Sequence, residues 1–266
     1  CRFLFDHHFM ILVIGENITD IFVYCSSKRL SPEACCPVLI PDNKVLNSGG
    51  AGNVVENLKS LRNKGIIGIH QKKEITKTRY IVGNQHVMRY DENDKCENLK
   101  IKELEESLSK RGLRLSRFKA VVISSYSKGF VTPKLIKDIR KKYDGLIFID
   151  TKDKKGDWCE LVDFIKINDK EWFENFNSKY EGSANIFVTK GSEGVDWINK
   201  NENFKVDPIE VADFVGAGDS FFSGFITKYL ESKDVKKGLD FANKCARVSV
   251  SKKGVVSVKK EEIAED

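Results

Sequence analysis

Short apolar runs alternate with longer amphipathic stretches along most of the chain. Strands are predicted at 10–14, 120–124, 146–150, 164–167 and 186–190, where apolar residues stand in short uninterrupted runs. Apolar positions at helical spacing predict helices at 53–63, 101–110, 132–143, 169–175, 220–231 and 235–252. Because strands and helices alternate, the pattern indicates an α/β fold with βαβ units and a mostly parallel, doubly wound sheet.

Two stretches interrupt this rhythm. Residues 18–46 and 75–91 are strand-like, with clear alternation at 78–82 (TRYIV), and neither is followed at once by a helix of its own. We predict that they form a small antiparallel β flap attached to the main sheet. The whole of 1–266 is then a single domain with an appendage, although residues 1–8 fit no pattern.

Composition places the chain among ordinary globular proteins. Hydrophobic residues make up 41% of the 266 positions and charged residues 32%, which excludes wholesale disorder. No apolar run approaches the roughly 20 residues needed to cross a bilayer, so no membrane partner is expected. The seven cysteines are scattered without a Cys-x-x-Cys pair, which disfavours a disulfide framework or zinc site and favours a cytoplasmic location.

The net charge of +6 suits anionic substrates, but lysines and glutamates are interleaved. A solvated surface accounts for such a charge pattern equally well. Because the basic residues are dispersed and no nucleic-acid motif occurs, no nucleic-acid partner is expected.

The segment DFVGAGDSFFSGF at 213–225 carries the candidate chemistry. Gly216, Ala217 and Gly218 lie between a stretch predicted to be extended, 207–212, and the start of an apolar helix. Backbone N–H groups at a helix N-terminus attract anions, and small residues allow a phosphate to approach them closely.

Asp219 would repel such an anion, unless its carboxylate accepts the proton of a hydroxyl that attacks phosphorus. The helix terminus should keep Asp219 ionised and therefore a weak base, which a loose phosphoryl transfer tolerates. A tight turn with Asp219 as a helix-favouring first-turn acid is the alternative. A Walker A sequence is absent.

A second glycine cluster, NSGGAGN at 47–53, opens another predicted helix. It lacks the third glycine of a dinucleotide fingerprint, because Val55 stands there, which disfavours an oxidoreductase. Gly49 and Gly50 could instead admit a polyhydroxylated ligand, with Asn53 offering a donor and an acceptor. A loop that merely turns is the alternative.

With both clusters in this order, the chain from about residue 10 onward resembles the ribokinase-like (PfkB) family of carbohydrate kinases. Gly49-Gly50-x-x-Asn53 looks like its N-terminal signature, and 213–221 looks like its C-terminal one. The resemblance implies an ATP- and Mg²⁺-dependent sugar kinase with Asp219 as the base. Further positions that match are Gly15 and Asp20 on the sugar side, Asn168 and Glu171 for Mg²⁺ held through water, Thr189, Gly191 and Gly194 beside the nucleotide, and Asn243 near the adenine.

Within the family, the flap is most similar to the kinase branch that phosphorylates D-glycero-D-manno-heptose 7-phosphate at C1. The matching segments are 29–38, 76–80, 84–91 and 124–129. This implies Lys77, Arg79 and Arg89 as candidates for holding the phosphate already on the substrate, although any one of them could be a solvated flap residue. Two alternatives are a ribokinase- or fructokinase-like enzyme for an unphosphorylated sugar and a degenerate relative that only binds nucleotide or sugar.

Three departures from the family pattern stand out. Ser125 replaces an Asp, Thr151 replaces the Pro of an Asp-Pro-Lys motif, and about 30 residues, roughly one βαβ crossover, are missing around 69–76. By family analogy, the flap's apolar residues at 21–23 (IFV) would be costly to expose, so a homodimer through the flap is expected.

Overall fold

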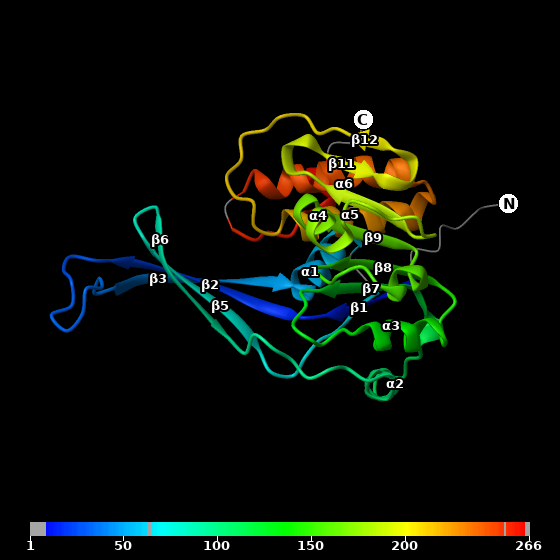
Figure 1. Ribbon diagram of the computed structural model, residues 1–266, viewed down its shortest axis with the longest axis horizontal. Coiled ribbons are helices and arrows are strands. Elements are labelled where there is room, and N and C mark those ends of the chain that lie inside the picture. Colours follow the sequence, from blue (N-terminus) through cyan, green and yellow to red (C-terminus); the bar gives the residue numbers. More distant parts are fainter. Residues whose placement is uncertain (1–8, 63–64, 253, 264–266) are drawn as a thin grey trace.

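The computed structural model describes residues 9–62, 65–252 and 254–263, which form two sheets of unequal size (Figure 1). Residues 1–8, and position 63 at the end of the first predicted helix, lie outside the described residues. The eight-stranded main sheet has the order β12-β11-β10-β9-β8-β7-β1-β4. Its strands are β1 (Met10–Gly15), β4 (Ile66–Ile69), β7 (Phe118–Ser125), β8 (Leu146–Thr151), β9 (Phe164–Asn168), β10 (Asn185–Thr189), β11 (Val195–Trp197) and β12 (Glu202–Phe204).

All pairings from β4 to β10 are parallel, and β11 and β12 are added antiparallel at one edge. The five predicted strands are therefore confirmed. The sequence pattern missed β4, β11 and β12, which have only three or four residues each and so show too little periodicity to be recognised.

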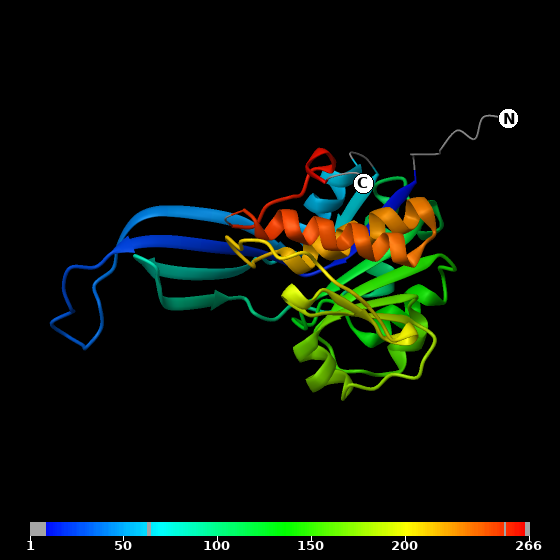
Figure 2. The ribbon, with the colours of Figure 1, turned by 90° about the horizontal axis from the view of Figure 1, so that it is seen from above.

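Helices cover both faces of the main sheet, which confirms the doubly wound architecture (Figure 2). One face carries α1 (Ala51–Arg62), α5 (Ala217–Ser232) and α6 (Val235–Val250), and the other carries α2 (Ile101–Ser109), α3 (Pro133–Arg140) and α4 (Asp169–Phe176). Short 3-10 helices lie at Leu115–Arg117, Asp157–Leu161, Gly191–Glu193, Ile198–Lys200 and Lys260–Glu262. In the described part of the chain, no helix is long and apolar enough to span a membrane.

The side chains of β1 show how one strand serves both layers. Leu12 and Ile14 join the core beneath α2, α3 and α4, whereas Ile11 and Val13 join the core beneath α1, α5 and α6. Successive residues of a strand point to opposite faces, so a strand buried on both sides reads as a continuous apolar run.

An aromatic cluster fixes α5 across the sheet. The Phe225 ring on α5 packs edge-on against Phe164 and Phe187, with ring centroids 5.3 and 4.6 Å apart, and stacks with Tyr229. Each fully buried ring of this size stabilises the fold by about 1.5–3 kcal/mol. The cluster thereby holds the N-terminus of α5 near the carboxyl ends of the strands.

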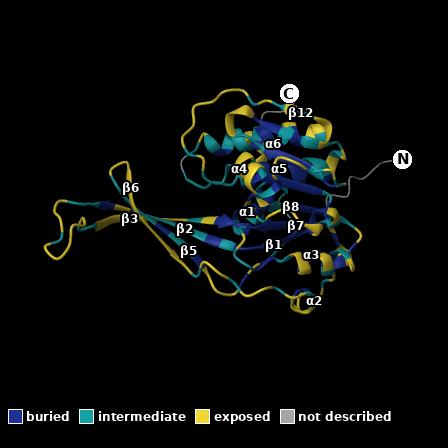
Figure 3. Ribbon diagram, in the orientation of Figure 1, coloured by how far each residue is buried: buried dark blue, intermediate teal, exposed yellow. Residues whose placement is uncertain are grey.

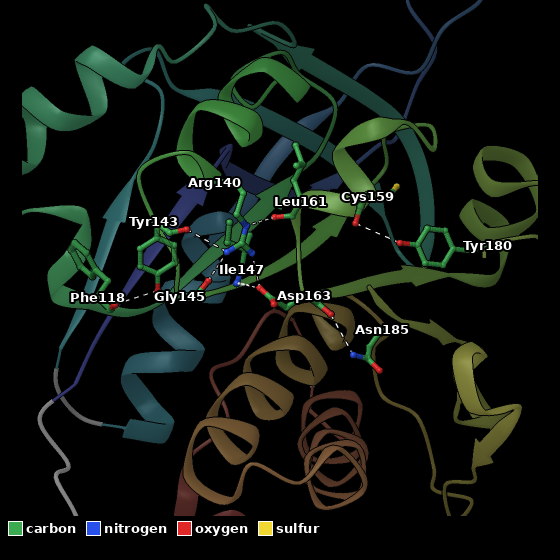
Figure 4. A network of polar contacts seen from close by, with 10 residues as sticks. All are labelled: Phe118, Arg140, Tyr143, Gly145, Ile147, Cys159, Leu161, Asp163, Tyr180 and Asn185. Atoms are coloured by element: carbon green, nitrogen blue, oxygen red, sulfur yellow. Dashed lines mark hydrogen bonds and ion pairs between the residues drawn. The ribbon is translucent and has the colours of Figure 1, made fainter. Parts of the chain in front are cut away.

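Arg140 ties the opposite end of the sheet together (Figure 4). Its guanidinium donates to the carbonyls of Leu161 and Gly145 at 2.7 and 2.9 Å, and to Asp163 Oδ2 at 2.7 Å. Asp163 also accepts from Ile147 N at the start of β8, at 2.8 Å. This network joins the end of α3 to β8 and β9, away from the strand ends that lie near the glycine-rich motifs.

The flap is a four-stranded sheet in the order β3-β2-β5-β6, formed by β2 (Asn17–Ser26), β3 (Ile40–Gly50), β5 (Ile75–Val82) and β6 (Gln85–Glu92). Its two outer pairings are antiparallel, but β2 and β5 pair in parallel. The prediction of an antiparallel flap was therefore wrong for its central pair. β1 and β4 are parallel neighbours, and each leads into a flap strand that leaves the main sheet in the same direction.

The flap extends far from the main sheet and is largely exposed (Figures 1 and 3). Only residues 70–74 connect β4 to β5, where the family resemblance led us to expect about 30 more. Gln71 holds this short connection, because its side-chain amide bonds both the N–H and the carbonyl of Asn17, at 3.0 and 2.5 Å. Among the described strands, β4 therefore forms the edge of the main sheet.

Candidate active site

The carboxyl ends of β1, β7, β8 and β9 meet the N-terminus of α5, where the glycines of the 213–225 segment lie. Gly216 caps the helix with φ +84°, and the helix begins at Ala217. Residues 207–212, which we expected to be extended, form no strand and lie in the loop before this turn. Asp213 holds this loop by accepting from the N–H groups of Val215 and Gly254, both at 3.0 Å.

Asp219 is buried and held by one donor on each oxygen. Asn53 Nδ2 donates to its Oδ2 at 2.7 Å, and the Tyr126 hydroxyl donates to its Oδ1 at 3.1 Å. The orientation of the Asn53 amide is fixed in turn, because Asn57 Nδ2 donates to Asn53 Oδ1 at 2.9 Å. The structure thus brings together Asn53 and Asp219, two of the residues predicted from separate motifs.

The pKa of Asp219 is raised to about 6, mainly by burial and also by the nearby Asp150 carboxylate. Asn53, Lys166 and Tyr126 oppose this effect by stabilising the ionised form. The sequence led us to expect a helix terminus to keep the carboxylate at ordinary acidity, but desolvation outweighs it. Asp219 is still mostly ionised at pH 7, and it is a stronger base than expected.

A buried cation lies against the glycine turn. Lys166 Nζ is 2.9 Å from the position that a Cβ at Gly218 would occupy, so a larger residue there would displace the ammonium. Lys166 also forms a 3.0 Å ion pair with Asp150, and both side chains are almost buried. Burial disfavours the charged ammonium, but Asp150, Glu171 and Asp219 outweigh it and raise the pKa of Lys166. The turn therefore combines the N–H groups at the start of α5, of which that of Ala217 also donates to the Phe214 carbonyl at 3.3 Å, with a fixed positive charge.

Asn168 and Glu171, the residues predicted to hold Mg²⁺ through water, cap α4 together. Glu171 N donates to Asn168 Oδ1 at 2.8 Å, and Asn168 N donates to Glu171 Oε2 at 2.9 Å. Burial raises the pKa of Glu171, while the bond from Asn168 and the charge of Lys166 oppose the rise. Glu171 Oε1 has no protein partner among the described residues. A carboxylate oxygen of this kind fits a magnesium ion that keeps its own waters.

The residues predicted on the nucleotide side lie around the end of β12. A Cβ at Gly194, which has φ +88°, would lie 2.0 Å from the Phe204 carbonyl oxygen, and Asn243 Nδ2 donates to the same oxygen at 3.0 Å. Gly191 begins the preceding turn with φ +57°. The Thr189 hydroxyl instead donates to the Ile167 carbonyl of β9, at 3.3 Å. Gly194 and Asn243 are thus brought together, while the hydroxyl of Thr189 is used within the sheet.

The residues predicted on the sugar side lie at the base of the flap. Asp20 forms an ion pair with Arg79, and a Cβ at Gly49 would come within 2.5 Å of Asp20 Oδ2. Gly50 has φ +60°, and a Cβ there would lie 2.3 Å from the Glu16 carbonyl oxygen. Gly49 therefore allows β3 to approach Asp20 of β2, and Gly50 allows it to approach the Glu16 main chain.

The three flap cations predicted to bind a substrate phosphate have different environments. Arg89 forms a fork with Asp91, with two bonds of 2.7 Å, and Arg79 is neutralised by Asp20. Lys77 faces the site, where its Nζ lies 5.6 Å from the centre of the Tyr126 ring. Burial lowers the pKa of Lys77, and repulsion from other cations, among them Lys128 and Lys152, lowers it further against the pull of Asp20.

Comparison with known proteins agrees with this geometry. A model of the pfkB family of carbohydrate kinases matches residues 67–262. The chain belongs to the PfkB family. That family is described as one of carbohydrate kinases.

Two curated relatives of this PfkB family member have the name "Bifunctional protein HldE". The protein of Campylobacter jejuni (strain RM1221) is 32% identical over 310 residues, which include 98% of this chain. That of Helicobacter pylori (strain J99) is 30% identical over 303 residues, which include 96% of this chain. The chain spans about 65% of the length of both relatives.

Solved structures with the same fold are more distant in sequence. Ribokinase from Thermotoga maritima superposes with a TM-score of 0.68 at 17% identity, covering 96% of this chain and 98% of that one. Arabidopsis thaliana ribokinase, solved in complex with ribose and ATP, gives 0.70 at 14% identity, with 96% and 97% covered. These likenesses confirm the ribokinase-like fold of the chain.

Two departures from the family pattern converge on one carboxylate. Ser125 Oγ and Thr151 Oγ1 both donate to Asp153 Oδ2, at 2.9 and 3.0 Å, and Ser127 Oγ donates to Asp153 Oδ1 at 2.6 Å. The carboxylate that Ser125 lacks is thus present beside it, supplied by the loop after β8. Pattern matching position by position could not reveal a carboxylate that comes from another loop.

Sequence reasoning also missed Lys166, Lys152, Glu16 and a role for Tyr126. Lys166 was visible as a lone charge inside the apolar run FIKI, and Glu16 as an acid directly after a buried strand. Tyr126 and Lys152 stand in segments that match the family, but no role was predicted for either. They become notable only because Lys152 Nζ lies 4.7 Å from the centre of the Tyr126 ring, beside Asp219.

Proposed function

We propose that this protein transfers the γ-phosphate of ATP to a hydroxyl of a sugar phosphate, such as the C1 hydroxyl of D-glycero-D-manno-heptose 7-phosphate. Residues 1–266 would act as one kinase domain with its β flap, in the cytoplasm where ATP is available. One observation carries the proposal: a buried carboxylate, Asp219, is fixed beside a glycine turn that also carries the Lys166 cation. The likeness of the flap to the heptose 7-phosphate branch supports the choice of sugar.

The chain's own residues divide the reaction between them. The N–H groups of Gly216, Ala217 and Gly218 and the Lys166 ammonium would stabilise the charge on the phosphates, while Asp219 accepts the proton of the attacking hydroxyl. Asn168 and Glu171 would hold a Mg²⁺ ion through its waters, and this ion supplies further neutralisation of phosphate charge. Positioning and charge compensation then account for most of the rate.

The substrate phosphate would be held by the lysines around Tyr126. Lys77 and Lys152 both lie over its ring, and Lys128 is close enough to lower the pKa of Lys77. Mutual repulsion between these lysines is relieved when a dianion binds among them.

A phosphorylation panel tests the substrate directly. We expect kcat/KM for heptose 7-phosphate to exceed that for ribose and fructose by at least about 10²-fold, since two charge-assisted bonds to a phosphate are each worth about 1.5–3 kcal/mol. Fructose 6-phosphate serves as a second phosphorylated sugar, and ADP release is measured for each. Release of ADP that no sugar increases would instead support the degenerate relative.

Lys77→Met provides a sharper test of the same assignment. The KM for the phosphorylated sugar should rise about tenfold or more, because one charge-assisted contact is lost. The KM for ATP should stay unchanged. Lys102→Met, which removes an exposed lysine of α2, is the matched control. Equal changes in KM for phosphorylated and neutral sugars would contradict the assignment.

A kinase of an unphosphorylated sugar is the second candidate. It is favoured by the ion pairs of Arg79 with Asp20 and of Arg89 with Asp91, which leave two of the three predicted cations already neutralised. In that case ribose or fructose would be the best substrate in the panel, and Lys77→Met would leave its KM unchanged.

We also propose that the flap mediates a homodimer. The expected apolar face at 21–23 is wrong, because Val23 is buried and the other two residues are half-buried. Other large apolar residues of the flap are exposed instead: Tyr24, Leu30, Ile40, Val45, Leu46, Val87, Met88 and Tyr90. A second copy of the same flap is the partner that would cover them symmetrically.

Sedimentation measures this directly. We expect the wild-type chain to sediment as a dimer at micromolar concentration, and Leu46→Asp to shift it to the monomer, because a buried unpaired charge is costly. Phe173→Asp, at an exposed phenylalanine on α4, should leave the dimer intact. A wild-type monomer would remove the proposal.

A further inference from the structure

Tyr126 links the candidate base to the loop that follows β7. Its hydroxyl donates to Asp219 Oδ1 at 3.1 Å, from the side opposite to Asn53, which donates to Oδ2. Burial and the neighbouring carboxylates raise the pKa of Tyr126, so its hydroxyl keeps the proton and acts as a donor. Each oxygen of Asp219 thus has one fixed donor and keeps a second lone pair for an incoming hydroxyl.

Glu16 holds the loop that presents Tyr126. Its side chain is completely buried, and its two oxygens accept from the N–H groups of Tyr126 at 2.8 Å and Phe130 at 3.1 Å. One carboxylate therefore closes both ends of the loop 126–130. The loop itself contains two positive-φ residues, Ser127 and Gly129, as a sharp turn requires.

The main chain of Glu16 also holds the helix that carries Asn53. Its carbonyl accepts from Ala51 N at 2.9 Å, at the first residue of α1, and Asn53 lies two residues further along. The single residue between β1 and β2 thus organises both elements that donate to Asp219.

We propose that Tyr126 is a positioning residue for Asp219, and that Glu16 keeps it in place through the 126–130 loop. The inference rests on the proposed role of Asp219 as the base. The phenol would hold the carboxylate plane toward the acceptor hydroxyl and stabilise its ionised form. The other groups that face Asp219 are Asn53 from α1, Asp150 from β8 and Lys166 from β9.

Tyr126→Phe tests the proposal through the pH dependence of kcat/KM. Loss of the donor destabilises ionised Asp219, so the pKa of Asp219 rises and the low-pH limb moves upward by about one pH unit. At pH 7 the loss of ionised Asp219 alone should lower kcat about twofold, because a pKa of about 6 moves to about 7. The KM values for ATP and sugar should change less than about twofold. A low-pH limb at its wild-type position overturns the proposal, whatever the loss in kcat, because a merely structural role would not move it.

Tyr143→Phe is the matched control. Tyr143 is a buried tyrosine at the opposite end of the sheet, where its hydroxyl donates to the Phe118 carbonyl at 3.2 Å (Figure 4). The same atom is removed, so any general effect of losing a buried hydroxyl is matched. This variant should keep the wild-type limb.

A second measurement separates this proposal from the role of Asp219 itself. In the folded protein labelled with ¹³C at aspartate Cγ, the Asp219 resonance is identified by its absence from Asp219→Asn. Its titration midpoint should be higher in Tyr126→Phe than in the wild-type protein, independently of turnover. An unchanged midpoint overturns the positioning role. Full turnover of Asp219→Asn would remove the base assignment and leave the measured coupling of Tyr126 to Asp219 intact.

Glu16→Gln tests the holding of the loop. In glutamine an NH₂ group replaces one of the two carboxylate oxygens. The remaining oxygen can accept from only one of the two N–H groups, so one end of the loop loses its acceptor. We expect the Asp219 midpoint to move in the same direction as in Tyr126→Phe, with little further change in the double variant. Independent, additive shifts would show that Glu16 does not act through Tyr126.

Discussion

Asp219→Asn is expected to lower kcat by about 10²-fold or more, the usual contribution of a positioned base. Asparagine keeps the size of the side chain and can still bond Asn53 and Tyr126, but it cannot accept the substrate proton. The affinity for ATP should stay close to wild type, because the N–H groups of the glycine turn and the Lys166 ammonium remain in place. Single-turnover kinetics and nucleotide titration measure the two effects separately.

Asp163→Asn is a useful control for this variant, since Asp163 lies in the Arg140 network away from the site. It should lower the melting temperature without a selective loss of kcat. If Asp219→Asn lost ATP affinity and rate in equal measure, Asp219 would be a helix cap and not the base.

Lys166→Met should lower both turnover and stability. The ammonium lies against Gly218 and also neutralises buried Asp150. Breaking a buried ion pair by removing one partner costs about 3–5 kcal/mol of unfolding free energy. Removing a preorganised charge at a reacting phosphate costs about 10²–10³ in kcat. Chemical denaturation and steady-state kinetics measure the two losses.

The double variant Asp150→Asn/Lys166→Met separates the two roles of the lysine. Without a charge left unpaired, most of the unfolding free energy should return, whereas kcat should stay low. Recovery of kcat together with stability would show that Lys166 acts only as the partner of Asp150.

The sequence predicted the layers of this fold well. In each strand or helix that is long enough to show a period, the apolar positions indicate which face is buried. The five strands between 10 and 190 and all six helices are present close to their expected positions. The errors occur where neighbours in space decide the outcome. Residues 207–212 have strand-like alternation but no strand to pair with, and the parallel contact of β2 with β5 depends on how β1 and β4 lie beside each other.

In the candidate site, too, local sequence predicted some features, and contacts between distant residues decided the others. Motifs located Asp219, Asn53 and the glycines, because special backbone positions and buried polar groups restrict the residue type. The acidity of Asp219 could not be predicted, since it depends on burial and on Asp150, which is distant in the chain. The carboxylate of Asp153 escaped detection for a related reason. Its three hydroxyl donors come from the last residue of β7, the loop after β7 and the last residue of β8.

The way the flap is joined to the main sheet determines how a sugar can enter. Only Glu16 separates β1 from β2, and Gln71 fastens the connection between β4 and β5 to the start of β2. Both junctions are short and hydrogen-bonded, so neither is expected to act as a flexible hinge between the flap and the main sheet. We therefore expect a sugar to enter when β2 and β5 twist and bend along their length. The stiffness of these two strands would then determine how readily the site opens.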